Sequence, residues 1–111
     1  MVDHVKMFNA AVANGDSTDY ADLNAYRDYS QTPCTITVDG IGNGTIVSLL
    51  YSPDDGATKV PLMGPNGTPY STTVKVAFTV AGSRGGRIYA RIASWTAGDA
   101  VTVWRPKSPF G

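Results

Sequence analysis

Apolar and polar residues alternate along three stretches in the second half of this 111-residue chain, Thr72–Val80, Arg87–Trp95 and Ala100–Arg105. Successive side chains of a strand point to opposite faces, so this alternation predicts half-buried β-strands. We expect the apolar set of the three strands to share one continuous core. Its members are Val74, Val76, Phe78, Val80, Ile88, Ile92, Val101 and Val103.

The first half of the chain carries shorter strand patterns. Strands are expected at Thr35–Val38, Thr45–Tyr51 and Thr58–Leu62, and the last of these is an edge strand because it contains Pro61. Both sides of Thr45–Tyr51 are fairly apolar, which is typical of a strand covered on both faces. The segment Tyr20–Tyr29 stays open between a short strand with a turn and one or two helical turns.

These patterns predict an all-β chain folded as a single antiparallel β-sandwich, jelly-roll or immunoglobulin-like, of about seven to eight strands. The domain spans residues 1–111. Residues 1–8 are expected to form an N-terminal arm, and residues 106–111 a C-terminal tail, because Pro106 cannot continue a central strand. The composition agrees, since the chain has no Glu and one Gln but 12 Gly and 7 Pro.

The net charge is zero, which disfavours nucleic acid and anionic membranes as partners. The charges are unevenly distributed, however. Residues 1–39 hold six Asp against Lys6 and Arg27, a net of −4, whereas residues 84–107 hold four Arg and one Lys against Asp99, a net of +4. The favoured interpretation is that the two regions neutralise each other within one fold. The alternative is complementary patches between subunits.

Residues that could support catalysis or metal binding are sparse. His4 is the only histidine, and no Gly-x-Ser-x-Gly motif is present, so we expect no enzymatic activity and no cofactor. Asp54 and Asp55, with Asp39 or Asp99, could supply the ligands of a calcium site. Their spacing fits no EF-hand loop, and Ser-Pro-Asp-Asp-Gly is typical of a turn, so no metal is expected. We also expect no signal peptide and no membrane span.

Aromatic residues offer two further interpretations. Arg87, Tyr89, Arg91 and Trp95 are expected on one face of a strand, which could stack nucleic-acid bases but is more typical of a packed sandwich face or a protein interface. A sugar-binding cleft could be lined by Tyr20, Tyr26, Tyr29, Tyr70 and Phe110.

Two segments resemble the small β-sandwich virion proteins of tailed bacteriophages. One is the hairpin Ser52–Gly56, and the other is the late strand segment Tyr89–Ile92. The likeness covers about residues 17–105. Ala57-Thr58-Lys59 stands where many relatives have Trp, and the tail Pro106–Gly111 matches no pattern of the family. The resemblance implies a head decoration protein or a small neck or tail component.

The resulting hypothesis is a capsid decoration (cement) protein that bridges major capsid subunits. It would lie on the capsid surface of the virion after synthesis in the bacterial host cytoplasm. Its partners would be the major capsid protein or other virion proteins, and the chain would be a homo-oligomer, with a trimer as one option. The alternative is a carbohydrate- or receptor-binding module of a phage tail or fibre. The apolar start of the chain must pair either with its own sheet or with a neighbour's edge, and we favour the neighbour or the capsid. The candidate interface residues are Val2, Val5, Phe8, Tyr20, Tyr26, Arg87, Arg91, Trp104 and Phe110.

Overall fold

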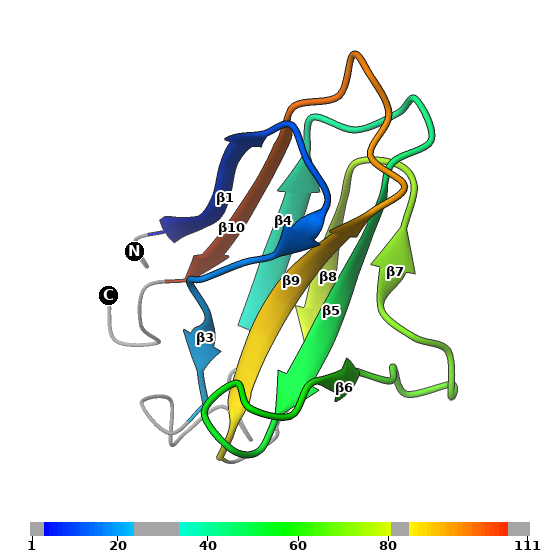
Figure 1. Ribbon diagram of the computed structural model, residues 1–111. Helices are drawn as coiled ribbons and strands as arrows, with labels where there is room; N and C mark the ends of the chain where they lie inside the picture. The colour runs from blue at the N-terminus through cyan, green and yellow to red at the C-terminus, as the bar shows by residue number, and fades with distance from the viewer. Residues whose placement is uncertain (1–3, 24–33, 81–84, 107–111) are drawn as a thin grey trace.

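Two antiparallel sheets pack face to face in the computed structural model, which describes residues 4–23, 34–80 and 85–106 (Figure 1). The strands are β1 (His4–Ala11), β2 (Gly15–Asp16), β3 (Ala21–Asp22), β4 (Cys34–Asp39), β5 (Ile46–Ser52), β6 (Val60–Pro61), β7 (Ser71–Thr72), β8 (Val76–Val80), β9 (Arg87–Ala93) and β10 (Val101–Pro106). The four-stranded sheet has the order β1-β10-β4-β8. The six-stranded sheet centres on β9 and β5. Short β2 and β3 pair with β9, and short β6 and β7 pair with β5.

The prediction of an all-β sandwich is confirmed, because every regular element of the described residues is a strand. The described strands number ten rather than seven or eight, since four of them are only two residues long. The expected strand at Thr58–Leu62 shrinks to β6, which lies at a sheet edge as Pro61 requires. In the ambiguous segment, Ala21 and Asp22 form β3. Residues 24–33 lie outside the described part of the chain.

The stretch Thr72–Val80 is two strands rather than one. Thr72 ends β7, which pairs with β5, whereas β8 begins at Val76 and pairs with β4 in the opposite sheet. Between them the Thr72 hydroxyl accepts a hydrogen bond from the Val74 backbone N–H at 3.1 Å, as in a turn. The chain therefore crosses from one sheet to the other, and Val74 is 59% exposed instead of buried.

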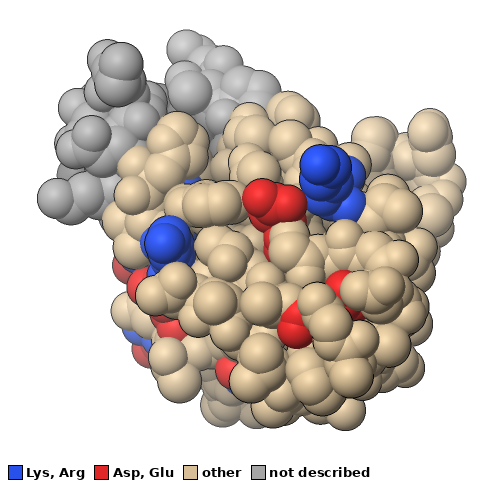
Figure 2. All heavy atoms as spheres, turned by 90° about the horizontal axis from the view of Figure 1, so that it is seen from above, with Lys and Arg blue, Asp and Glu red and all other residues tan. Residues whose placement is uncertain are grey.

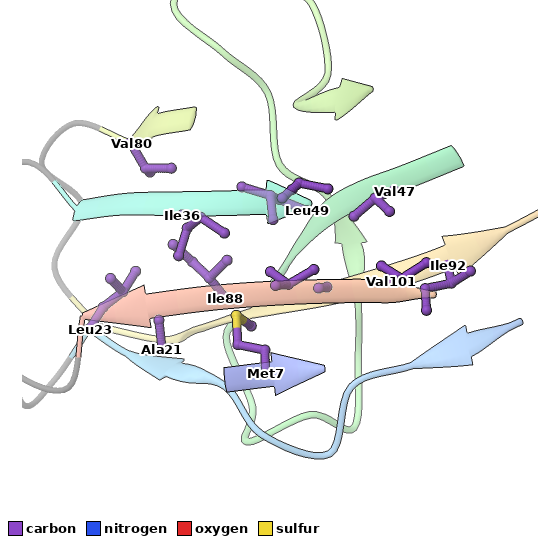
Figure 3. Close-up of a cluster of buried hydrophobic side chains, with 13 residues drawn as sticks. Met7, Ala21, Leu23, Ile36, Val47, Leu49, Val80, Ile88, Ile92 and Val101 are labelled. Atoms are coloured by element: carbon purple, nitrogen blue, oxygen red, sulfur yellow. The ribbon is translucent and has the colours of Figure 1, made fainter. Parts of the chain in front are cut away.

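The hydrophobic core lies between the sheets, and Figure 3 shows its side chains gathered there. It comprises Met7, Ala21, Leu23, Ile36, Val38, Val47, Leu49, Val80, Ile88, Ala90, Ile92, Val101 and Val103. Five of the eight predicted core residues are in this set. Phe78 is only partly buried and meets the Tyr70 ring edge-on at 5.3 Å, and Val76, at the start of β8, is 36% exposed. The prediction of one continuous core is therefore wrong for the first part of the stretch.

The N-terminal segment belongs to its own sheet. Residues 4–11 pair with β10, and Met7 is 5% exposed within the core. The expected arm that adds to a neighbour is therefore wrong for residues 4–8, because their apolar side chains already have a covered surface in the same chain. Pro106 lies opposite His4 at the end of β10, so it terminates a strand rather than starting a tail. Residues 1–3 and 107–111 lie outside the described ranges.

Both faces of β5 are covered, as predicted. Val47 and Leu49 point into the core. Leu50 points to the opposite face and is still only 2% exposed. Its cross-strand partner there is Tyr89, which is 5% exposed. This second buried cluster lies on the outer face of the six-stranded sheet.

Candidate interaction surfaces

Arg87, Tyr89 and Arg91 share the outer face of β9, as the alternation predicted, because Ile88 and Ile92 point into the core. Trp95 does not share that face. Ser94 has φ 52° and lies beyond the end of β9. The Trp95 indole N–H instead donates to the Asp99 carbonyl at 3.0 Å.

Two tyrosine rings form the centre of this outer face. Tyr20 and Tyr89 lie 5.5 Å apart between ring centroids. The guanidinium of Arg87 lies 3.9 Å from the Tyr20 centroid, and the ammonium of Lys59 lies 4.6 Å from the Tyr89 centroid. Gly56 packs so closely that an added Cβ would come within 2.7 Å of the Tyr89 hydroxyl. Cations of the same chain thus already cover these rings, which makes the face a poor stacking platform for a base or a sugar.

Asp16 holds the basic residues of this face together. Its carboxylate accepts from Arg91 Nε at 2.6 Å and from Arg91 Nη2 at 3.1 Å, and Lys59 Nζ lies 3.2 Å away. Asp19 accepts in the same two-pronged way from Arg105, at 2.7 and 3.1 Å. The acidic early residues and the basic late strands therefore neutralise each other within one chain, as the favoured interpretation predicted.

The Asp16 pair predicts a measurable acid sensitivity. The hydrogen bond from Arg91, supported by Lys59, lowers the pKa of Asp16 below its ordinary value and raises that of Arg91. A lowered folded-state pKa stabilises the protein above the unfolded pKa, near 4, and this stabilisation is lost as the pH falls through the lowered value. We expect Asp16→Asn to cost about 1 kcal/mol at pH 7, and the difference from the wild type to vanish toward pH 2.

Denaturant unfolding of both proteins between pH 7 and pH 2 measures this difference. Asp55→Asn is the matched control. Asp55 also pairs with an arginine, Arg87, but at 3.5 Å and with a side chain 81% exposed, so its loss should barely change stability. A pH-independent deficit of Asp16→Asn would show that the carboxylate acts through packing rather than charge.

The outer face of the four-stranded sheet has a different character. Since Ile36, Val38, Val101 and Val103 point inward, their strand neighbours point outward. We call this surface the threonine face, formed by Thr35, Thr37, Ala77, Thr79, Thr102 and Trp104. Trp104 is partly exposed, opposite Thr37 on one side and Lys6 on the other. The Lys6 ammonium lies 5.9 Å from the centroid of its ring.

The structure describes six of the nine predicted interface residues and does not gather these six at one place. Tyr20, Arg87 and Arg91 lie on the outer face of the six-stranded sheet, and Trp104 lies on the threonine face. Phe8 packs against the core, and Val5 is a partly buried residue of β1. Val2, Tyr26 and Phe110 lie outside the described residues. Sequence reasoning missed Asp16, Asp19 and Lys59. The charge asymmetry along the chain was the available signal for the two aspartates, and no sequence signal pointed to Lys59.

Asp54, one of the candidate calcium ligands, forms hydrogen bonds within its own turn. Asp54 accepts from the Thr58 N–H at 2.6 Å and from the Ser52 hydroxyl at 3.0 Å, and Thr58 is the main cause of its lowered pKa. Within the described residues no three of His, Cys, Asp and Glu are grouped to hold a metal ion. That part of the chain also has no helix of the length and apolar character needed to cross a membrane.

Comparison with protein-family models, curated proteins and solved structures found no match for this chain. On its two outer faces, the charged face is paired internally, whereas the threonine face presents a partly exposed tryptophan.

Proposed function

We propose that this chain is a phage virion structural protein, and specifically a capsid decoration protein that docks on major capsid subunits through the threonine face. The observation that carries the proposal is Trp104, a partly exposed tryptophan on one face of a sheet, with Thr37 on one side and Lys6 on the other. Tryptophan anchors at the centre of an interface contribute more binding energy than most residue types, and charged residues are depleted there. The resemblance to small phage virion proteins supplies the class of partner.

The other outer face is less suited to docking. Its arginines and lysine are bound to Asp16, Asp55 or a tyrosine ring, so a partner would have to replace bonds that already exist. On the threonine face a partner can cover the Trp104 ring and approach a flat row of small hydroxyl-bearing side chains. Burial of the indole then adds favourable apolar area without breaking an ion pair.

The hairpin Ser52–Gly56, which carries part of the resemblance, stabilises the six-stranded sheet and is not assigned to the binding surface. Ser52 is fully buried, and its hydroxyl accepts from the Gly56 N–H at 2.7 Å. Arg87 reaches this turn, donating to the Asp55 carbonyl at 3.2 Å. The turn therefore fixes the end of the six-stranded sheet, and binding is assigned to the opposite sheet.

Binding to expanded capsids of its own phage tests the proposal. The wild-type chain should co-sediment with the capsids and raise their melting temperature, whereas Trp104→Ala should bind about 30-fold or more weakly. Arg91→Lys, on the other outer face, is the control and should bind like the wild type. Both variants should still unfold cooperatively.

Two results would contradict this assignment. One is unchanged capsid affinity of Trp104→Ala, which would remove the threonine face from the interface. The other is glycan binding by the isolated chain without any capsid binding, which would favour the carbohydrate- or receptor-binding module.

A further inference from the structure

Among the described residues, three of the four sheet edges have features that prevent pairing with another strand. Along β1, irregularities interrupt the register on both sides of Phe8, and Ala10 has φ 51°. The edges of the six-stranded sheet consist of two-residue strands, and one of them contains Pro61. Short strands, bulges and proline are the usual ways in which proteins block edge pairing.

The fourth edge, β8, has none of these features. Its five residues pair with β4 in unbroken register and include no charge, no proline and no bulge. Val76 is 36% exposed and the preceding Val74 is 59% exposed. An open edge of this kind, flanked by exposed valines, is a template for another strand.

One hydrogen bond shows toward which side of β8 the backbone N–H and C=O groups of Thr79 point. The Tyr70 hydroxyl donates to the Thr79 carbonyl at 3.1 Å, although β4 occupies the other side of β8. Residue 79 therefore points its backbone groups away from β4. In an antiparallel ladder this alternates, so Ala77 points its backbone groups outward as well, and Lys75 directly precedes the strand at the same edge. Tyr70 covers the end of the edge at Thr79, which leaves the part near Val76 open.

We propose that β8 pairs antiparallel with β8 of a second copy of this chain, about a two-fold axis at Val76. In this register Val76 faces Val76 of the second copy, and Lys75 faces Ala77. The outward backbone groups of residues 75 and 77 meet as hydrogen-bonded pairs. The exposed Val76 gains an apolar partner, and the pairing avoids the Thr79 carbonyl that Tyr70 occupies.

A second copy fits this edge because the segment is self-complementary. Lys75 is the only charge between residues 74 and 80, and it faces an alanine, so no like charges oppose each other. The interface is isologous and closes as a dimer. The two four-stranded sheets become one continuous sheet, and the two threonine faces lie on the same side of it. This inference does not depend on the capsid role.

Charge substitutions at the two-fold axis test the pairing. Light scattering on the purified chain should give twice the mass of one chain. Val76→Lys and Val76→Asp should each raise the dimer dissociation constant at least about 100-fold, because like charges would face each other. An equimolar mixture of the two variants should form the heterodimer again. Val12→Lys, at a valine 59% exposed elsewhere, should remain dimeric.

Ala77→Pro provides a second variant. It removes an outward N–H that the β4 ladder does not use, so it should dissociate the dimer without unfolding the monomer. A wild-type chain that stays monomeric up to about 1 mM would overturn the proposal, as would a trimer. Failure of the mixed Lys and Asp variants to associate would also overturn it, because the two positions would then not face each other.

Discussion

Replacing Ile36 by alanine should lower the free energy of unfolding by about 3 to 4 kcal/mol. Ile36 is fully buried on β4, an inner strand of the four-stranded sheet, and its side chain points between the two sheets. Truncation removes the transfer free energy of the lost methyl and methylene groups. It also leaves a cavity that the surrounding strands, held by hydrogen bonds on both sides, can fill only in part.

Urea unfolding of the wild type and the variant measures this loss. Val12→Ala is the control, since Val12 is 59% exposed and should change stability by less than about 0.5 kcal/mol. Similar losses at the two positions would mean that the inner face of β4 is not the packed core. A changed slope against urea, rather than a changed midpoint, would point to an altered unfolded state.

Local alternation predicted the inner strands well because their pattern is determined within a few residues. In β9 the sequence places Ile88 and Ile92 on one face and Arg87 and Arg91 on the other, and the structure agrees. The apolar character of both sides of β5 likewise predicted a strand covered on each face. Here Leu50 is buried against the outer cluster rather than the core.

Alternation could not predict which sheet a strand joins. The residues of β7 and β8 continue one pattern, yet Thr72 pairs with Val47 and Val76 pairs with Val38 of the opposite sheet. Apolar and polar residues alternate with a period of two in both sheets. The alternation therefore does not reveal where the chain passes from one sheet to the other. The pairing of β1 with β10 was missed for a similar reason, since it joins the two ends of the chain and nothing local specifies it.

The sequence predicted that oppositely charged segments would meet, but it did not predict which residues pair or on which face they lie. The charge asymmetry predicted that early aspartates would meet late arginines. The chosen pairs, Asp16 with Arg91 and Asp19 with Arg105, join residues 75 and 86 positions apart, and only the folded topology brings them together. The sequence predicts Trp104 as an interface residue. It lies on a different face from Arg87 and Arg91 because β10 and β9 belong to different sheets, which the sequence pattern does not specify.

One end of the sandwich is closed by hydrogen bonds between two loops. The Asp99 carboxylate accepts from the Asn43 side-chain amide at 2.7 Å, and the Thr45 hydroxyl accepts from the Thr96 N–H at 2.9 Å. Hydrogen bonds from Thr45 and Asn43 hold the pKa of Asp99 below its ordinary value. Figure 2 views the molecule from above and shows a mostly uncharged surface with isolated charged side chains. The hydrogen bonds from Asn43 and Thr96 thus join the two loops at this end of the sandwich.

Gly40 lies where these loops come closest. It has φ 76°, a left-handed conformation that side chains disfavour, and its carbonyl accepts from the Ala100 N–H at 3.0 Å. A Cβ added at Gly40 would overlap the carbonyl oxygen of Ala100, which is backbone and cannot rotate away. An alanine here must therefore push the two loops apart.

Gly40→Ala should lower the free energy of unfolding by about 3 kcal/mol, of which about 1 to 2 kcal/mol is the left-handed conformation and the rest the lost loop contact. Gly67→Ala separates these two contributions. Gly67 has nearly the same φ, 75°, but nothing lies within 4 Å of an added Cβ, so its substitution should cost only about 1 kcal/mol. Thermal and urea unfolding of both variants measure the difference. Equal losses would mean that backbone conformation alone requires glycine at residue 40, and that the contact with the Ala100 carbonyl does not hold this end of the sandwich closed.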